Sequence, residues 1–400
     1  MARTQAVLPG GARLSDYLSV GVIAQVFPLP AVRAALDECG RRSQRQRSLP
    51  AEVMVYYVIA LALFRSVSTR EVLRCLVDGL RWMASSMPVR VSGKSSISRA
   101  RTRLGTAPFE ALCRARVGVV AEQHARGAWY RGRRLVAFDG STLDVPDEAE
   151  NREEFGVPGA GRGEAAFPQV RLTAVVEVGT RTAFAWHRGP LRESEAEQAE
   201  ALLGHLSDEM LVLADRYYFG FPLWLRATRT GADLLWRVKA NMRLPVLERH
   251  ADGSFRSIVR GSGRDRRRST GECSIRVVEY RIEGEGDEVF RLATTLLDPS
   301  QAPATELAAL YHERWECENA YDEVKTHLLG ADSVLRSKTP DLVRQEVDGL
   351  MLAYYAVRRL IYAAARQADE DPDRLSFVHA VRVIRRRVQN PGAFPPRRLR

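Results

Sequence analysis

The sequence contains few cysteines, and their spacing excludes two common ways of stabilising a fold. No Cys-x-x-Cys pair occurs, which argues against a zinc cluster and against a disulfide framework. The five cysteines are scattered along the 400 residues, at Cys39, Cys75, Cys113, Cys273 and Cys317. We therefore expect a reduced, cytoplasmic protein that depends on a buried apolar core.

Long apolar segments are also absent. The longest apolar run covers residues 53–64, only 12 residues, and is too short to span a bilayer. Residues 1–13 contain no apolar stretch followed by a small-residue cleavage site, so no signal peptide is expected. With 45% hydrophobic residues, the chain can bury a large core, and the run at 53–64 is expected to be a buried helix.

Lysine is scarce, and the positive charge is unevenly distributed. Only four of the 60 basic residues are lysines; the arginine excess suits phosphate recognition, although a GC-rich genome produces the same bias. The net charge of +11 resolves into +13 over residues 1–133, −9 over 134–380 and +7 over 381–400. Basic ends around an acidic middle favour a polyanionic partner, with compositional drift as the alternative.

The first third of the chain is predicted to be helical. The apolar patterns and cap residues predict helices at 49–64, 69–80 and 95–104. The third helix carries Arg99, Arg101 and Arg103, an arrangement typical of DNA-binding helices. Many helical bundles also carry exposed arginines, so this pattern alone leaves DNA contact as one of two interpretations.

The pattern changes to alternating strands and helices near residue 131. Strands are predicted at 135–138, 170–178, 182–186, 210–214, 234–238 and 290–294, and helices at 193–206, 219–228, 306–329, 341–368 and 373–388. This order resembles an α/β domain of the ribonuclease-H-like fold. We therefore predict a helical, DNA-binding N-terminal domain at 1–130, a catalytic α/β domain at 131–335, and a helical segment with a basic tail at 336–400.

Two aspartates follow fully apolar strands. Asp139 ends the predicted strand at 135–138, and Asp215 ends the strand at 210–214. A single aspartate after a strand is usually a turn former or a helix cap. Two at matched positions of one sheet would lie close together, and a divalent metal ion is the usual solution to their repulsion.

A polar stripe occupies the predicted helix at 306–329. On an uninterrupted helix, Tyr311, Glu318 and Lys325 would fall within about 40° of one another, with Arg314 about 60° away. A core-facing helix would carry apolar residues there. The alternative is a solvated face with an i,i+4 ion pair between Arg314 and Glu318.

These residues match a family. The spacing Tyr-x2-Arg-x3-Glu-x6-Lys resembles the signature of DDE transposases of the insertion-sequence-four family. The segments Asp139-Gly-Ser-Thr and Asp215-Arg-Tyr-Tyr, the acidic and glycine-rich stretch at 144–169, and the region at 14–80 are also similar to that family. The resemblance implies a ribonuclease-H-like catalytic domain with a β-strand insertion at 241–288.

The resemblance also implies the roles of the site residues. Asp139, Asp215 and Glu318 would bind two Mg²⁺ ions, for which Mn²⁺ could substitute, about 3.5–4 Å apart. None of the seven histidines forms a metal-spaced pair. Tyr311, Arg314 and Lys325 would hold DNA phosphates beside the scissile bond.

Phe290 departs from the family pattern. It stands where members often place a tryptophan that stacks against a flipped base. An aromatic ring can stack on a base, but the alternation of Phe290 with Leu292 favours a core position.

The function implied is that of an insertion-sequence transposase. Such an enzyme binds the inverted repeats at element ends, cleaves the DNA and joins it to target DNA, as a homodimer in the bacterial cytoplasm, associated with the nucleoid when bound to DNA. The chain stops at residues 395–400, where family members commonly continue. A truncated or inactive DNA-binding derivative and a nuclease without strand transfer are therefore the alternatives.

Overall fold

A computed structural model describes residues 21, 23–44, 47–83, 91–160, 163–164, 166–261, 271–282, 289–330 and 333–386. The predicted basic tail therefore lies outside the described residues. By its packing the chain divides into two compact units. The first unit comprises Met1–Val120, Leu143–Val170 and Tyr321–Arg400, and the second comprises Ala121–Thr142 and Arg171–Ala320.

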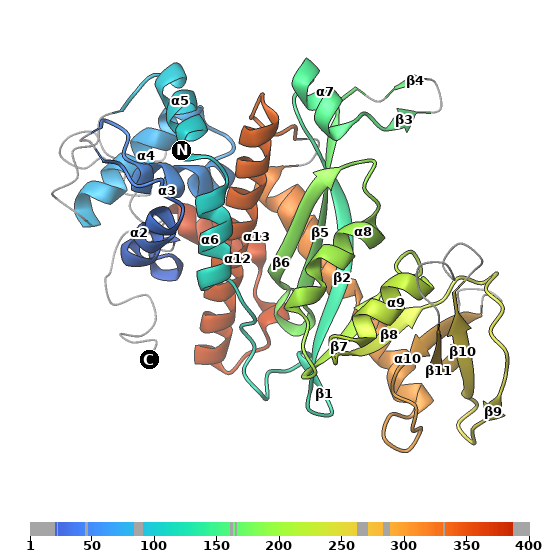
Figure 1. Ribbon diagram of the computed structural model, residues 1–400. Helices are drawn as coiled ribbons and strands as arrows, with labels where there is room; N and C mark the ends of the chain where they lie inside the picture. The colour runs from blue at the N-terminus through green and yellow to red at the C-terminus, as the bar shows by residue number, and fades with distance from the viewer. Residues whose placement is uncertain are drawn as a thin grey trace, which may run out of the picture. The chain divides into compact units, whose positions relative to one another are not determined.

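A mixed β-sheet forms the centre of the second unit (Figure 1). Its strands are β1 (Trp129–Tyr130), β2 (Arg133–Asp144), β5 (Gln169–Glu177), β6 (Thr182–Pro190), β7 (Met210–Ala214), β8 (Asp233–Arg237), β9 (Glu248–Arg249), β10 (Phe255–Arg260), β11 (Glu272–Tyr280) and β12 (Phe290–Thr294). The spatial order is β6-β5-β2-β7-β8-β12-β11-β10-β9, with β1 paired to β2. Strands β2, β7 and β8 run parallel, and β8 to β12 are joined antiparallel.

This topology confirms the predicted fold class. Three consecutive strands, helix α8 (Glu195–Leu202), β7, helix α9 (Phe221–Thr228) and β8 follow one another as predicted, and β7 and β12 coincide with the predicted strands. Every residue of β7 is buried, which is typical of a central parallel strand covered on both faces. Strands β9, β10 and β11 lie within the predicted insertion and extend the sheet beyond β8.

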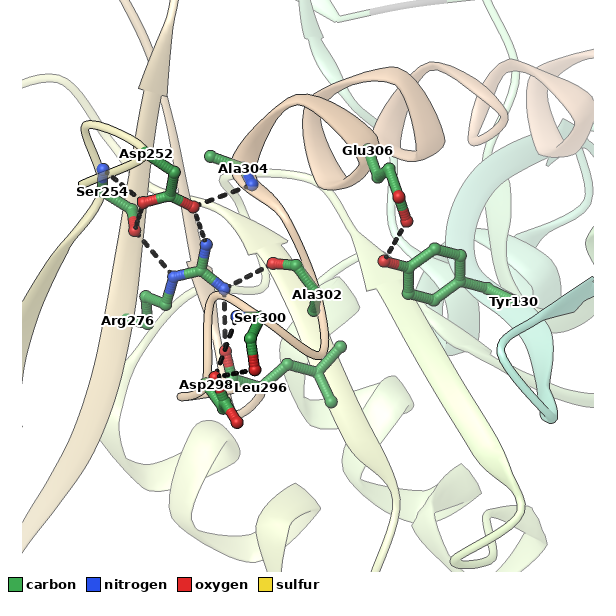
Figure 2. Close-up of polar contacts among 10 residues, drawn as sticks. All are labelled: Tyr130, Asp252, Ser254, Arg276, Leu296, Asp298, Ser300, Ala302, Ala304 and Glu306. Atoms are coloured by element: carbon green, nitrogen blue, oxygen red, sulfur yellow. Dashed lines mark hydrogen bonds and ion pairs between the residues drawn. The ribbon is translucent and has the colours of Figure 1, made fainter. Parts of the chain in front are cut away.

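A buried arginine fixes the insertion to the start of the next helix, α10 (Ala304–His312). Figure 2 shows the Arg276 guanidinium of β11 donating to Asp252 Oδ2 at 2.5 Å, Ser254 Oγ at 2.8 Å and the Ala302 carbonyl at 2.6 Å. Asp252 also accepts the backbone N–H of Ala304 at 3.0 Å. The first turn of α10 is therefore positioned by the insertion.

A second contact holds α10 from the other side of the same unit. The Tyr130 hydroxyl, from β1, donates to Glu306 Oε2 at 2.9 Å (Figure 2). Arg131 binds the same carboxylate at 2.9 Å. Because α10 carries Tyr311, these contacts help to fix the position of that signature residue.

The predicted helix at 306–329 is wrong in one respect, because it is not continuous. Three pieces take its place: α10, α11 (Trp315–Asp322) and a π-helical segment (Glu323–Leu329). At the break the Arg314 N–H bonds to the Tyr311 carbonyl at 3.2 Å and the Cys317 N–H bonds to the Arg314 carbonyl at 2.9 Å, so bonds to the third preceding residue replace the α-helical pattern. The signature residues therefore do not share one helical face.

Helices form the first unit. They are α2 (Leu29–Glu38), α3 (Ala51–Leu63), α4 (Thr69–Met83), α5 (Lys94–Leu104), α6 (Ala107–Arg116), α7 (Ala149–Phe155), α12 (Pro340–Ala368) and α13 (Phe377–Arg386), with the short strands β3 (Gly159–Ala160) and β4 (Gly163–Glu164). The three predicted N-terminal helices correspond to α3, α4 and α5. Helix α12 packs on α3, so the C-terminal helices and the N-terminal helices share one core.

Helix α12 also brings buried charges into that core. The Glu346 carboxylate pairs with Arg65 at 3.1 Å. The Arg358 guanidinium donates to Glu323 at 2.7 Å, and the Tyr354 hydroxyl donates to the same carboxylate at 3.2 Å. Buried ions persist only when paired in this way. Within the described residues, no helix is long and apolar enough to cross a membrane.

The Arg276 cluster gives a prediction about stability. We expect Arg276→Gln to lower the free energy of unfolding by about 3 kcal/mol, because the buried Ser254 hydroxyl and the buried Ala302 carbonyl lose a charged donor. Urea unfolding followed by circular dichroism measures the change. Arg260→Gln is the matched control, because Arg260 forms an exposed ion pair with Glu272 at 2.9 Å. Equal losses for the two variants would contradict the assignment.

Candidate active site

The pairing of β2 with β7 aligns the two predicted aspartates. The parallel register pairs Val136 with Val212 and Ala137 with Leu213. Continued by two residues, the same register sets Asp139 opposite Asp215, on strands about 4.8 Å apart. Strand β2 runs on to Asp144, so the prediction that Asp139 ends its strand is wrong. Asp139 lies within a strand that continues beyond the end of β7.

The surroundings of the Asp139 carboxyl disfavour its ionised form. Burial raises its pKa to about 6, against the opposing influence of Arg314 and of the Gly140 N–H. The negative charges of Glu318 and Glu195 raise it further. Glu318 is thus close enough to Asp139 for their repulsion to matter.

Two signature residues support the site, Tyr311 from the end of α10 and Arg314 from the turn after it. The Tyr311 hydroxyl donates to the carbonyl of Ala214 at 3.3 Å, beside Asp215. The Arg314 guanidinium donates to Glu318 Oε1 at 2.7 Å. The pKa of Arg314 is raised above its ordinary value, although burial acts in the opposite direction. Tyr311, Glu318 and the two aspartates raise it, so this arginine faces the whole acidic group.

The structure therefore brings together five of the predicted residues in the second unit: Tyr311, Arg314, Glu318, Asp139 and Asp215. Lys325, the last signature residue, is exposed in the π-helical segment and belongs to the first unit. The sequence pattern placed Tyr311, Arg314, Glu318 and Lys325 on one helix, and the structure divides them among α10, the turn after it, α11 and the π-helical segment.

Phe290 occupies the core position that its alternation with Leu292 favours. Its side chain is 8% exposed, and its ring stacks on Tyr280 with 5.5 Å between centroids. The Arg237 guanidinium covers the ring at 4.3 Å. In this position the ring is not open to a DNA base.

Two family models match this sequence. The model described as Insertion element 4 transposase N-terminal matches residues 17–114, and the model described as Transposase DDE domain matches residues 130–356. The second alone covers more than half of the chain. The chain belongs to the DDE transposase family. The resemblance seen in the signature residues is thereby confirmed.

Relatives of this DDE transposase extend over most of its length. It is 28% identical over 391 residues, 96% of the chain and 84% of the relative, to the transposase InsG for insertion sequence element IS4 from Escherichia coli (strain K12). It is 26% identical over 224 residues, 56% of the chain and 72% of the relative, to the putative transposase InsZ from the same organism. The cryo-EM structure of a piggyBac transposase synaptic complex with hairpin DNA aligns with 92% of the chain and 79% of that protein, at a TM-score of 0.47 and 9% identity.

Membership of this family settles the class of activity. The protein is an insertion-sequence transposase, an enzyme that cleaves DNA and transfers the strand, and it depends on a divalent metal ion. An inactive DNA-binding derivative is not favoured.

The carboxylates of the site fit a divalent cation in their chemistry. Oxygen donors suit hard cations, and a cation would relieve the repulsion that disfavours ionised Asp139. Among the residues that the structure describes, no three acidic, histidine or cysteine side chains are already arranged to hold an ion. Glu318 is paired with Arg314 through its Oε1 atom, and its side chain is 40% exposed.

Three arginines of α5 were predicted to contact DNA, and the prediction is wrong for Arg101. Arg101 is buried, and its guanidinium donates to Gln345 Oε1 at 2.7 Å and to the Leu342 carbonyl at 2.9 Å. It lies on the face of α5 that packs on α12. Arg99 and Arg103 are exposed on the other faces.

An arginine-lined pocket in the first unit was missed from the sequence. It has a volume of about 270 Å³ and is lined by Arg41, Arg42, Arg47 and Arg103. Arg42 is paired with Asp37 at 2.9 Å. The run Arg-Arg-Ser-Gln-Arg-Gln-Arg at 41–47 was the available signal in the sequence, and only the fold sets Arg41, Arg42 and Arg47 in one pocket with Arg103 of α5.

Arg101 gives a prediction that separates structure from DNA contact. We expect Arg101→Gln to lower the free energy of unfolding by about 2 kcal/mol, because Gln345 and the Leu342 carbonyl lose a charged donor. Arg103→Gln, the matched control on the same helix, should change it by less than about 0.5 kcal/mol. Thermal or urea unfolding of the two variants decides, and a stable Arg101→Gln protein would refute the buried role.

Proposed function

We propose that Asp139, Asp215 and Glu318 are the catalytic, cation-binding carboxylates of this transposase. The observation that carries the proposal is the parallel register of β2 and β7, which aligns the two aspartates. The influence of Glu318 on Asp139 supports the third member. Two bound Mg²⁺ ions, for which Mn²⁺ can substitute, would supply Lewis acidity for phosphodiester hydrolysis and transesterification.

Arg314 has a double task in this proposal. In the DNA-free protein its guanidinium holds Glu318 at 2.7 Å, with only 13% of the Arg314 side chain exposed. A guanidinium binds phosphate with the same fork that binds a carboxylate. An arriving DNA phosphate would therefore take Arg314 from Glu318 and leave the glutamate available as a ligand. Tyr311, fixed by its bond to the Ala214 carbonyl, would orient the same strand.

Phosphate contacts away from the scissile bond are assigned to exposed cations of the first unit. Arg47 and Arg103 belong to the arginine-lined pocket, and Arg99 is exposed. Lys325, which is also exposed, would hold a phosphate beside the scissile bond together with Tyr311 and Arg314. Buried Arg101 and buried Phe290 are left out of this set. The contacts are to the backbone, so they would strengthen binding to any duplex and position the protein on the inverted repeats at the element ends.

The remaining parts of the proposal concern assembly and organisation. Cleavage and joining of two element ends in target DNA would suit a homodimer bound to DNA in the cytoplasm, at the nucleoid. Residues 1–130 would form the DNA-binding domain, 131–335 the catalytic domain and 336–400 a helical segment with a basic tail. The packing of α12 on α3 supports a shared role for the first and last of these.

The carboxylate assignment predicts a loss of chemistry without a loss of binding. Asp139→Ala, Asp215→Ala and Glu318→Ala should each lower the rate of Mg²⁺-dependent nicking at element ends by about 10⁴-fold, because the three act as a unit. Glu313→Ala, an exposed carboxylate at the turn before α11, is the matched control and should nick normally. Wild-type nicking by Glu318→Ala would overturn the assignment.

The same assay separates a transposase from a simple nuclease. With pre-nicked element ends, the wild-type protein should join the 3′-hydroxyl to target DNA, and the three alanine variants should not. Nicking without joining would favour the nuclease. Equal affinity of all variants for end DNA, measured without metal, shows that binding is intact.

The arginine-lined pocket predicts a change in salt dependence. Arg47→Gln and Arg103→Gln should each reduce the slope of log affinity against log salt concentration by about 1, because each loses one phosphate contact. Arg374→Gln is the control, since Arg374 is an exposed arginine of the same unit paired with Glu370. Fluorescence anisotropy with duplex element-end DNA gives the slopes. Unchanged slopes for both pocket variants would remove the pocket from the DNA interface.

A further inference from the structure

A carboxylate outside the family signature lies directly beside the proposed site. Glu195 is the first residue of α8, whose start is fixed by a capping box between Ser194 and Glu197. Its side chain covers Gly140, the residue after Asp139. A Cβ atom at Gly140 would stand 2.8 Å from the Glu195 carboxyl carbon, so only glycine allows this approach.

The Glu195 carboxylate is held in place but not sealed from solvent. Arg171, from β5, donates to its Oε1 atom at 3.0 Å. The Glu195 side chain is 29% exposed. An ion could therefore reach it.

A buried hydroxyl points to the same place. Tyr218 is 2% exposed, and its ring stacks on Phe138 with 5.8 Å between centroids. Within the described part of the chain its hydroxyl has no hydrogen-bond partner. Burial raises its pKa, and so do the negative charges of Glu195, Asp139 and Asp215. The hydroxyl is therefore an uncharged donor, on a ring that stacks against the residue before Asp139.

We propose that Glu195 is a fourth carboxylate of the cation-binding site, and that the Tyr218 hydroxyl donates to an oxygen atom of the cation-loaded cluster. The inference rests on the proposed function, because it assumes that Asp139 and Asp215 bind the ion. It adds a residue from α8, a helix that the family signature does not include.

The physical reason is the charge count. Affinity for a hard divalent cation rises with the number of carboxylates around it. With the charge of Glu318 partly offset by Arg314, a further carboxylate would strengthen the site, and Glu195 supplies it from the first residue of α8. A buried phenol that cannot ionise serves only as a donor, to a carboxylate or to a water molecule on the ion.

The test measures Mn²⁺ binding to the full-length, DNA-free protein, by calorimetry and by the loss of the free-ion signal in electron paramagnetic resonance. Glu195→Gln should weaken binding about 10-fold. Glu200→Gln removes the same charge from the same helix, where Glu200 forms an exposed pair with Arg226 at 2.6 Å, and should bind as the wild type does. Glu195→Asp, which keeps the charge, should recover most of the affinity.

Tyr218→Phe should have two opposite effects. Without metal the variant should unfold at a temperature equal to or above that of the wild type, because a buried hydroxyl without a partner is removed. With Mn²⁺ its gain in unfolding temperature should be smaller, and its affinity about 10-fold weaker. A purely structural tyrosine would not change the response to the ion.

Two outcomes distinguish this inference from the proposal on which it rests. If Asp139→Asn abolishes Mn²⁺ binding but Glu195→Gln equals Glu200→Gln, Glu195 is not part of the site. If Asp139→Asn itself binds normally, the aspartate assignment fails. Should Glu195→Gln not fold, Glu195→Asp with wild-type stability and wild-type affinity supports the charge role, and Glu195→Asp with affinity as low as that of Tyr218→Phe contradicts it.

Discussion

The register between β2 and β7 is the constraint on which the site depends. Side chains alternate between the faces of a strand, so a shift of one residue would turn Asp139 away from Asp215. The register is set by buried apolar residues such as Val136 and Val212, which pair along the two strands. Packing in the core therefore holds Asp139 in a buried position, at a cost that is visible in its raised pKa, of which burial is the largest cause. The buried apolar residues of the two strands thus favour this register over registers that would separate the two aspartates.

Arg314 allows this acidic group to exist in the protein without DNA. Its guanidinium neutralises Glu318 and lowers the pKa of Asp139. In the proposed mechanism, binding of substrate and of the cation would be coupled, because a DNA phosphate that competes for Arg314 would also free Glu318.

The sequence predicted those elements of the fold that depend on neighbouring residues in the chain. The strand at 210–214 and the aspartate that follows it could be found because a buried parallel strand is continuously apolar and ends at a polar residue. The break at Arg314 could not, because both neighbouring segments have helical composition. The burial of Arg101 depends on α12, more than 200 residues away in the sequence. Glu195 carries no distinguishing signal, because acidic residues are common in the first turn of any helix.

The insertion strands help to position the helix that carries Tyr311. Arg276 joins the turn at Asp252 to the backbone of Ala302, just before α10. The helix that presents Tyr311 therefore begins on a residue network that belongs to the insertion. A smaller catalytic domain cannot be obtained by deleting β9 to β11 and closing the gap. Any shortened version must supply a new acceptor for the Ala304 N–H and a new anchor for the first turn of α10.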